Sequence, residues 1–387
     1  MNQEELEKHN SGMMEMLPMA PAGEACCPSS QSTPLSLPSL DQSFVVGSVE
    51  TPLGKVPQVS SILKGEDRWG SYRVRWGIRR MHYTIEPGLY ALGRPDPSAP
   101  VLVTANYKMT FDRLREALPN RNVWILVLDT KGVNVWCAAG KGTFGTEELV
   151  ARIRSSGLER IVNHRDLILP QLGAPGVAAH LVKKLSGFKV IYGPIHAVDL
   201  PAFLDGGLQA TPEMRRKAFP FGERAVLVPI ELVAASKVAV LVLPVVFILG
   251  GLKGVEGFWA NAMNHGLFAV MAFSLAILLG AVVTPLLLPF LPGRAFALKG
   301  FFLSVPGVIF YLYFWDMGSA ARVGQLEKLA WVLLIPAISA YLAMNFTGAS
   351  TYTSLSGVKK EMRWAVPMEI GAAVFGLVLW LGALFFS

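Results

Sequence analysis

The sequence predicts two regions of different class, an α/β domain with a parallel sheet and an all-α domain of membrane-spanning helices. Residues 1–225 carry 26 Lys/Arg and 22 Asp/Glu, whereas residues 226–387 carry only 9 and 6. In addition, short apolar runs alternate with helical patterns between residues 101 and 192. Average soluble proteins have about 25% charged residues. The second region is therefore expected to face something other than water.

Composition excludes several classes of protein. The chain has 387 residues, longer than one ordinary domain, and only three cysteines. Three cysteines cannot build a disulfide scaffold, a four-cysteine zinc site or a four-cysteine iron–sulfur cluster. The net charge of +7 is modest and is shared by both regions. We therefore expect no iron–sulfur cluster in this chain and no nucleic acid among its partners.

The first segment, residues 1–43, is rich in Pro, Ser and Met and has no periodicity, which predicts a disordered tail. It contains the adjacent Cys26 and Cys27, which could bind a soft metal but whose role stays open. The α/β domain is expected at residues 44–225 and the transmembrane domain at residues 226–387.

The earliest strand pattern lies at residues 72–79, where Tyr, Val, Trp and Ile alternate with Arg and Gly. A period of two predicts a half-buried strand. Its basic face could contact phosphates of a nucleic acid or a cofactor, or could simply be solvated.

From residue 101 onward, strands and helices are expected to alternate. The predicted strands are residues 101–105, 122–129, 160–162 and 188–192. The helices between them are expected up to Leu118, from near Thr146, whose hydroxyl could cap it, and over 174–186. This alternation predicts parallel strands with helices on both faces, a Rossmann-like arrangement. Ligands of such sheets bind outside the carboxyl ends of the strands, so we expect the site in the loops at 104–106, 129–145, 163–166 and 193–194.

The loop at residues 129–145 is the most unusual of the four. Its glycines match neither G-x-G-x-x-G nor the phosphate-binding frame G-x-x-x-x-G-K-[ST]. Asn134 could cap one turn of helix that presents Cys137 above the sheet, where small neighbours would let a large flat ligand approach. A lone cysteine is more often a buried, inert thiol than a reactive one. His164 and His196 are each more typical of structural histidines than of metal ligands.

Five membrane spans are predicted, because a bilayer core needs about 20 apolar residues in a helix. They are residues 232–252, 266–288, 296–315, 328–346 and 366–386. Nine Lys/Arg in the short loops fall on the side of the N-terminal domain and three on the other. This asymmetry favours a multi-pass protein of the inner (cytoplasmic) membrane, with its N-terminal domain cytoplasmic and its C-terminus outside.

A specific resemblance is carried by the run Asn134-Val-Trp-Cys-Ala-Ala-Gly-Lys141 and its continuation Gly142-Thr-Phe-Gly-Thr-Glu-Glu-Leu149. These residues resemble the signature of the mercury-methylating corrinoid proteins. Residues 103–109, 162–165 and 193–194 also resemble that family. The resemblance covers residues 68–387 and implies a cytoplasmic corrinoid-binding domain followed by five spans. A more distant similarity is to the large subunit of the corrinoid iron–sulfur protein of acetyl-CoA synthesis.

The resemblance implies a corrinoid-dependent methyltransferase that transfers a methyl group from methyl-Co(III) to Hg(II), giving methylmercury. It implies that Cys137 is the lower axial cobalt ligand, and the histidine signature D-x-H-x-x-G, which would otherwise supply that ligand, is absent. The implied corrinoid contacts are Asn134, Val135, Trp136, Cys137, Ala138, Ala139, Gly140 and Lys141, with Gly142, Thr143, Thr104 and Asn106 as weaker candidates.

The same resemblance implies the partners. They are a dicluster [4Fe-4S] ferredoxin as electron donor and a methylated folate-type donor or its methyltransferase. Two alternatives stay open. One is a corrinoid methyl carrier with a non-mercury acceptor, as in acetyl-CoA synthesis, and the other is a membrane receptor or transporter with a cytoplasmic nucleotide-binding domain.

Overall fold

A computed structural model describes residues 35–253, 257–318, 323–349 and 355–385 of the chain. Most of the expected tail, with Cys26 and Cys27, lies outside these residues. Residues 35–43, however, are attached to the α/β domain. The backbone N–H of Ser36 donates to the carbonyl of Ser155 at 2.8 Å, and Gln42 donates to the Tyr90 hydroxyl at 2.9 Å. The predicted end of the tail at residue 43 is therefore too late.

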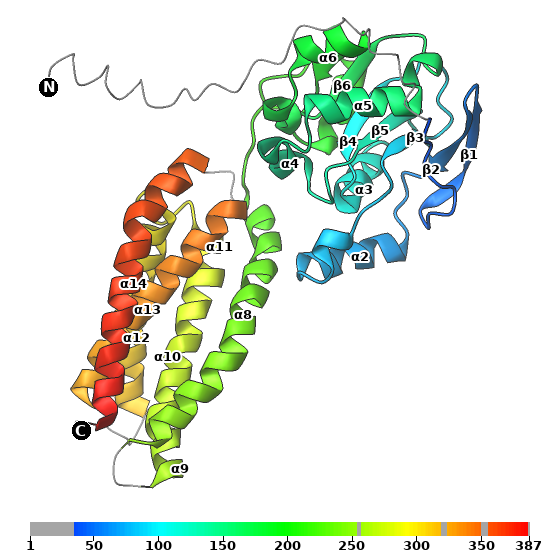
Figure 1. Ribbon diagram of the computed structural model, residues 1–387. Coiled ribbons are helices and arrows are strands. Elements are labelled where there is room, and N and C mark those ends of the chain that lie inside the picture. The colour runs from blue at the N-terminus through cyan, green and yellow to red at the C-terminus, as the bar shows by residue number, and fades with distance from the viewer. Residues whose placement is uncertain (1–34, 254–256, 319–322, 350–354, 386–387) are drawn as a thin grey trace, which may run out of the picture. The chain divides into compact units, whose positions relative to one another are not determined.

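The α/β domain is built on a seven-stranded mixed sheet (Figure 1). Its strands are β1 Val45–Thr51, β2 Gly54–Val59, β3 Gly88–Leu92, β4 Val101–Ala105, β5 Val123–Leu128, β6 Asp166–Leu169 and β7 Lys189–Tyr192. Their order across the sheet is β1-β2-β3-β5-β4-β6-β7. Strands β5, β4, β6 and β7 are parallel, whereas β3 runs antiparallel to β5. The predicted parallel core is confirmed, and β1 to β3 extend it beyond the prediction.

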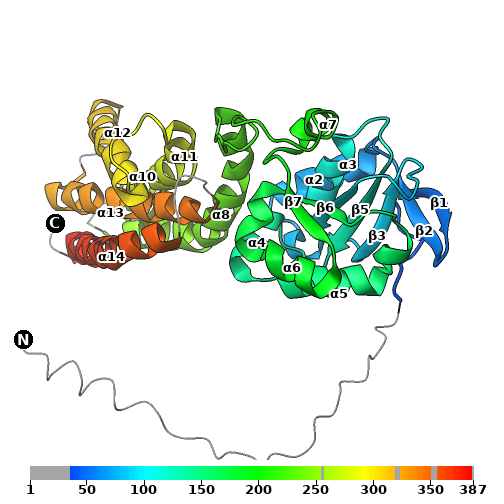
Figure 2. The same cartoon turned by 90° about the horizontal axis from the view of Figure 1, so that it is seen from above.

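Helices cover both faces of the sheet (Figure 2). On one side lie α4 Val135–Lys141, α5 Thr146–Ser156 and α6 Ala179–Ser186, and on the other lie α2 Gly65–Arg75, α3 Lys108–Glu116 and α7 Leu200–Asp205. Short 3-10 turns connect them at Arg80–His82, Leu158–Arg160, Gln171–Gly176 and Ala197–Asp199. This two-sided cover explains why the central strands are apolar throughout, since both faces of each are buried.

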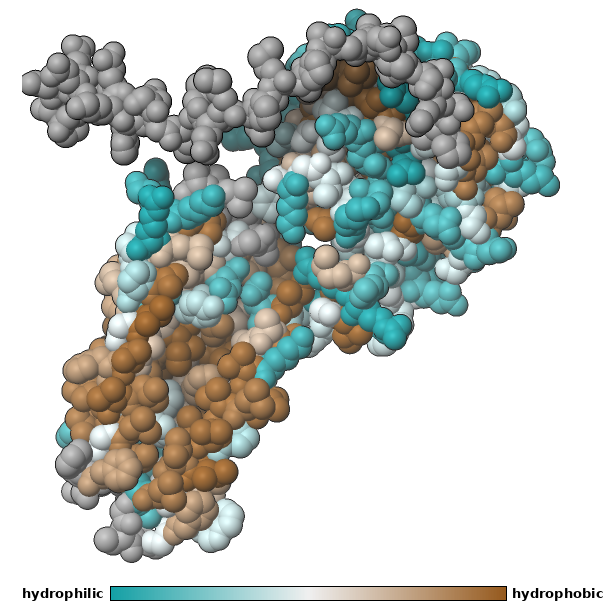
Figure 3. All heavy atoms as spheres, in the orientation of Figure 1, coloured by the Kyte–Doolittle hydropathy of each residue, from teal (hydrophilic) through white to brown (hydrophobic). Residues whose placement is uncertain are grey.

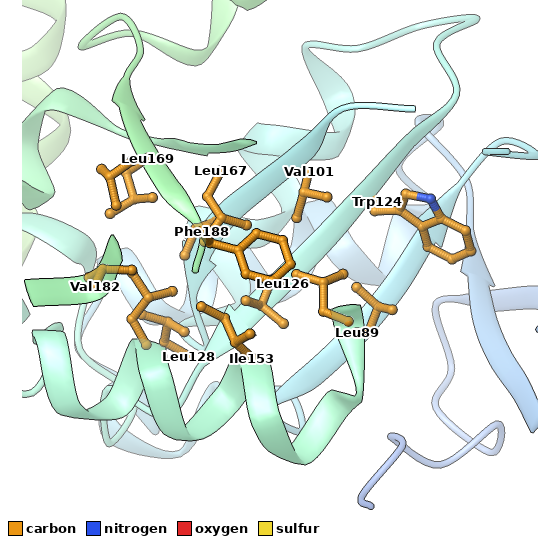
Figure 4. Packing of buried hydrophobic residues seen from close by; sticks show 14 of the residues in the cluster. Leu89, Val101, Trp124, Leu126, Leu128, Ile153, Leu167, Leu169, Val182 and Phe188 are labelled. Atoms are coloured by element: carbon orange, nitrogen blue, oxygen red, sulfur yellow. The ribbon is translucent and has the colours of Figure 1, made fainter. Parts of the chain in front are cut away.

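Strand β4 illustrates how the core forms. Val101 belongs to the same buried cluster as Ile153 of α5 and Val182 of α6 (Figure 4). Its neighbour Leu102 joins the opposite cluster, which contains Phe111 of α3. Because side chains alternate between the two faces of a strand, a strand buried on both sides is an unbroken apolar run in the sequence.

The strand predicted at residues 72–79 is wrong. Helix α2 covers residues 65–75, and the chain then turns through Gly77 and Arg79, whose φ angles are 75° and 51°. Lys64 and Asp67 form a capping box at the start of the helix. Of the alternating apolar residues, only Val74 is buried. The alternation therefore does not reflect a sheet face, and the helix-start signals outweigh it.

The third parallel strand lies later than predicted. After α5 ends at Gly157, where φ is 59°, residues 158–160 form a 3-10 turn. The strand is β6, so the loop at residues 163–166 lies at the amino end of the strand and not at its carboxyl end. Thr146 does not cap α5 either, because Gly145 is the N-cap residue and the Thr146 hydroxyl accepts from the Ala178 N–H at 2.8 Å.

The second region consists of five helices that are long and apolar enough to cross a membrane. They are α8 Phe221–Gly251, a helix over Phe258–Leu287, α12 Phe296–Gly318, α13 Gln325–Asn345 and α14 Leu355–Phe385. The second comprises α9 Phe258–Asn261, α10 Leu267–Ile277 and α11 Thr284–Leu287, joined by π-helical turns at Ala262–Gly266 and Leu278–Val283. Apolar side chains gather over these helices and polar ones over the α/β domain (Figure 3). The five predicted apolar helices are confirmed, although α8, the helix over Phe258–Leu287 and α14 begin earlier than predicted.

Helix α13 is the most enclosed of the five. A Cβ atom on Gly280 or on Gly300 would come within 2.7 Å of the Ser339 carbonyl oxygen, so small residues bring these backbones together. Near the start of α13, the Glu327 carboxylate accepts from Lys253 Nζ at 2.7 Å and lies 2.8 Å from His265 Nδ1. Lys253 and Glu327 are both buried, so this contact joins the loop after α8 to α13.

Candidate functional site

A pocket lies at the carboxyl ends of strands β4, β6 and β7. Within the α/β domain, its lining includes Thr104, Tyr107, Asn134, Val135, Trp136, Leu169, Pro170, Gly193, Pro194 and His196. This is the edge at which α/β sheets bind ligands. Three of the four loops expected to form the site therefore meet here. The fourth, at residues 163–166, does not, and Leu169 and Pro170 at the carboxyl end of β6 take its place.

Asn134 begins helix α4, as the sequence predicts. Its φ and ψ are −65° and 160°, and its side-chain Oδ1 accepts from the backbone N–H of Cys137 at 2.9 Å. An asparagine at this position satisfies an N–H group that has no partner inside the helix. The cap therefore holds the backbone of Cys137 in place.

One face of α4 is buried and consists of Val135, Ala138 and Ala139. The helix rests directly on the backbone of Gly176. A Cβ atom at that glycine would come 2.1 Å from the Phe144 carbonyl oxygen and 3.0 Å from Ala139 Cα. Only a glycine fits this contact, so α4 is seated closely against the turn at residues 171–176.

The opposite face of α4 carries Cys137, which is half-buried, together with the exposed Gly140 and Lys141. A Cβ atom on Gly140 or on the following Gly142 would meet no atom within 4 Å. Cys137 has no disulfide partner within the described ranges. The thiol therefore lies one turn of helix from the open space at Gly140. Cys137 itself does not line the pocket, whereas its neighbour Trp136 does.

Asn106 has a different place from the one expected for a ligand contact. Its Oδ1 accepts from the N–H and hydroxyl of Thr130 and from the N–H of Gly132, at 2.9 to 3.1 Å. Its Nδ2 donates to Asp129 at 3.1 Å. These bonds occupy the amide and fix the loop that leads into α4. Asn106 is thus a positioning residue, whereas Thr104 lines the pocket itself.

At the start of the same loop, the negative charge of Asp129 is paired with the positive charge of Lys131. Burial alone would raise the pKa of Asp129, but hydrogen bonds and the positive charge from Lys131 outweigh burial and lower that pKa. Lys131 adopts a left-handed conformation with φ of 57°, which brings its ammonium group back onto Asp129. The carboxylate therefore stays ionised and neutralises the lysine.

Tyr107 is a pocket residue that the sequence-based site prediction left out. Burial raises the pKa of its hydroxyl. That hydroxyl is buried and has no hydrogen-bond partner in the portion of the chain that the structure covers. A buried polar group without a partner is costly, so the Tyr107 hydroxyl is a candidate donor for a polar group of a ligand. Its position two residues after the end of β4 was the available signal.

The two histidines considered from the sequence are separated. His164 Nε2 lies 3.0 Å from the Ala99 carbonyl oxygen, and its Nδ1 accepts from the Asp166 N–H at 3.2 Å. It therefore braces the amino end of β6. His196 lies in the pocket lining.

The donor chemistry of the site restricts which metal group would fit. Among the described residues, no group of three or more His, Cys, Asp or Glu could hold a metal ion. A metal at Cys137 would have to bring most of its ligands with it, as the metal of a macrocycle does. The lone thiol and the open space one helical turn away fit such a group.

Comparison with known proteins gives a match inside the α/β domain. Residues 79–204 match the family described as CdhD, CO dehydrogenase/acetyl-CoA synthase delta subunit. An acetyl-CoA decarbonylase/synthase complex subunit gamma of Methanopyrus kandleri is 34% identical over 123 residues, which are 31% of this chain and 26% of that protein. The corresponding subunit of Archaeoglobus fulgidus is 32% identical over 123 residues, with the same coverage.

The name of a third relative includes the word corrinoid. The corrinoid/iron–sulfur protein large subunit of Moorella thermoacetica is 29% identical over 126 residues, which are 32% of this chain and 28% of that protein. The chain spans about a quarter of the length of these relatives. The matched segment contains β4 to β7, α4 and the pocket lining drawn from them, so the α/β domain is related to corrinoid proteins.

Proposed function

We propose that the α/β domain binds a corrinoid, that Cys137 is its lower axial cobalt ligand, and that the protein is a membrane-anchored methyl carrier. The observation that supports this most is the thiol of Cys137, carried by a capped helix one turn from open space. This thiol lies in the segment related to corrinoid proteins. The domain that carries it is proposed to be cytoplasmic.

Several residues of the chain would hold the cofactor. When bound, a corrinoid supplies a cobalt centre that carries a methyl group and can release it to an acceptor. Asn134 fixes the backbone beneath the ligand atom, and Gly140 and Gly142 leave room for a broad ring. Tyr107 offers its unpaired hydroxyl to the polar periphery of the ring. Ala138 and Ala139 are buried and anchor α4 in the core.

The cysteine also influences the transfer. A thiolate is a stronger and softer donor than an imidazole, so Cys137 would raise the electron density at the metal. This favours release of the methyl carbon together with its bonding electron pair. Thiolate ligation by Cys137 would therefore suit transfer of the methyl group to an electrophilic acceptor.

The relatives favour one class of acceptor. Their names refer to acetyl-CoA synthesis and to its reverse, so a carrier that passes the methyl group to a non-mercury acceptor of that chemistry is the function closest to the comparisons.

The second candidate is methyl transfer to Hg(II), an electrophilic acceptor that thiolate ligation by Cys137 would suit. A bound corrinoid would supply the methyl group, and Hg(II) would accept the methyl carbon together with its bonding electron pair, which would give methylmercury. A thiolate ligand promotes this polarity of transfer. The carrier would be reduced by a dicluster [4Fe-4S] ferredoxin and would receive its methyl group from a methylated folate-type donor or its methyltransferase.

Purification of the full chain with a corrinoid tests the first step. Bound cobalt and a corrin absorption spectrum are expected, and their absence would favour a receptor or transporter instead. An electron paramagnetic resonance spectrum of the Co(II) form should lack nitrogen superhyperfine splitting from an axial base. Such splitting would contradict sulfur ligation.

The acceptor is tested with the same loaded protein. Methylmercury formed from Hg(II), and lost in Cys137→Ala, would support mercury methylation. Cys137→His serves as a matched variant, because it should retain corrinoid but transfer poorly to Hg(II). Loaded, reducible protein that forms no methylmercury would leave the acetyl-CoA type of acceptor.

A further inference from the structure

Helix α2 and the turn after it carry an unusual set of exposed side chains. Trp69, Tyr72, Trp76, Ile78 and Met81 are 65%, 57%, 49%, 49% and 58% exposed. Arg68, Arg73 and Arg79 are exposed among them. We call these eight residues the aromatic–arginine surface. A surface that collects large apolar side chains usually has a partner.

The geometry of the helix explains why these aromatic residues share a face. Trp69, Tyr72 and Trp76 follow one another at intervals of three and four residues, which places them on one side of a helix. The other side is buried through Asp67 and Val74. Gly70 faces Tyr83 so closely that a Cβ atom would come 2.5 Å from the Tyr83 hydroxyl. The aromatic side is therefore held outward by packing on the inward side.

A buried ionic cluster fixes the helix in this orientation. Asp67 accepts from Lys108 Nζ at 2.5 Å and from Arg115 at 2.8 Å, and Asp112 accepts from both of these residues at 2.7 and 2.8 Å. All four side chains are buried. Helix α2 is thus bound firmly to α3, and its exposed face is a stable feature of the domain.

The charge of this surface is positive. Residues 65–82 contain five arginines and two acidic residues, one of which is the buried Asp67. Arg68, Arg73 and Arg79 form no ion pair with any residue that the structure describes. Their charges are therefore available to an external anionic group.

We propose that the aromatic–arginine surface docks onto the headgroup region of an anionic lipid bilayer. Tryptophan and tyrosine favour the interface between hydrocarbon and water, and helices with an aromatic face flanked by arginine lie in that plane. Anionic lipids attract such basic segments. The same chain carries five helices able to cross a membrane. The covalent connection keeps the domain close to a bilayer, so weak contacts of this surface suffice to hold it there.

Tryptophan quenching by brominated lipid tests this directly in the full chain reconstituted in nanodiscs. The double variant Trp69→Phe/Trp76→Phe is compared with the wild type, and the difference between them isolates the signal of these two residues. With brominated phosphatidylglycerol added to phosphatidylcholine, that signal should fall about twofold or more, because the rings enter the interface. Trp124→Phe is the matched control, since Trp124 is buried in β5 and its signal should not be quenched.

The arginines are tested in the same assay. Arg68→Glu/Arg73→Glu/Arg79→Glu should abolish the quenching of Trp69 and Trp76, and high salt should weaken it. Arg160→Glu, an exposed arginine after α5, should leave it unchanged. Equal quenching by brominated phosphatidylcholine in bilayers without phosphatidylglycerol, or in the triple variant, would overturn the role of anionic headgroups. Absence of quenching, including the case in which a soluble protein alone shields these rings, would overturn lipid docking. All of the substituted arginines are exposed, and melting curves verify that the variants are folded.

Discussion

Helices α4 and α2 are both short, and both bury one face while leaving the other outward, yet they differ in what holds them and in what they present. Helix α4 is held by an asparagine cap and by contact with the backbone of Gly176, and it presents one thiol beside small residues. Helix α2 is held by buried ion pairs and presents large aromatic rings between arginines. Small residues around a single donor suit a flat ligand that comes close, whereas rings and cations suit a broad polar interface.

The largest expected effect is on the anchoring of α2. Asp67→Asn removes the charge that faces Lys108 and Arg115 and leaves these cations buried with too few partners. Breaking a buried ion pair costs about 3–5 kcal/mol, so the free energy of unfolding, measured with urea, should fall by about that amount. Glu66→Gln, one residue earlier and exposed, is the control and should have little effect. Equal stability of the two variants would show that the cluster does not anchor α2.

The same cluster gives a pH dependence. Burial opposes ionisation of Asp67, but the hydrogen bond and charge of Lys108, with help from Arg115, lower its pKa below the ordinary value of 3.8. A carboxyl group with a lowered folded-state pKa stabilises the fold fully above its unfolded pKa. That contribution is lost as the pH falls through the folded value. Urea titrations below pH 4 should show a steeper loss of stability in the wild type than in Asp67→Asn.

The next effect is on the chemistry proposed for α4. Cys137→Ala should reduce methyl transfer by about 100-fold or more, since even residues that only support a metal ligand cost 10- to 100-fold when changed. The melting temperature should not change, because the side chain is half-buried and makes no disulfide within the described residues. Transfer at the wild-type rate would exclude Cys137 as the ligand.

Substitutions at two glycines distinguish the packing of α4 against the domain from the space that α4 leaves for a ligand. Gly176→Val should destabilise the domain by about 1–3 kcal/mol, because the new side chain overlaps Phe144 and Ala139. A Cβ atom at Gly140 would meet no atom within 4 Å, so Gly140→Val should leave stability nearly unchanged. It should weaken corrinoid binding about tenfold, a change of about 1.4 kcal/mol. Titrations of apo protein with corrinoid measure the second effect. Unchanged affinity in Gly140→Val would place the ring elsewhere.

The smallest effect is expected at the cap. Asn134→Ala removes the hydrogen bond to the Cys137 N–H and should cost about 1 kcal/mol. Asn134→Ser, which can still cap the helix, should retain most of the stability. If both variants melt alike, the cap does not stabilise α4.

Much of the parallel core and the five apolar helices could be predicted from the sequence, because each is a continuous apolar run of the right length. The capped turn at Asn134 was also predictable, since its signal is local. Strand β6 was misplaced because Ile161 and Val162 are apolar but are buried in a turn, whereas the run ending at Pro170 was the real strand signal.

The error at α2 and the unexpected hydrogen bonds of Asn106 have a different cause. Alternating apolar residues at 72–79 suggested a strand because exposure of tryptophan and isoleucine was not expected, and only the fold shows that these side chains face outward. Asn106 follows a strand, as a ligand contact would, yet its amide is consumed by Thr130 and Gly132. Long-range burial and bonding partners are not encoded in local spacing, so neither could be inferred from the pattern.

The contact between Lys253 and Glu327 has a consequence for how the chain enters the membrane. The lysine is synthesised just after α8, but the carboxylate of Glu327 follows only with α13, after two further helices have been inserted. A chain that stops before Gln325 would leave Lys253 and His265 without this counter-charge at the end of the bundle. Truncated products should therefore fail to form a stable helix bundle. The fourth helix would have to be inserted before the end of the first helix is stably packed.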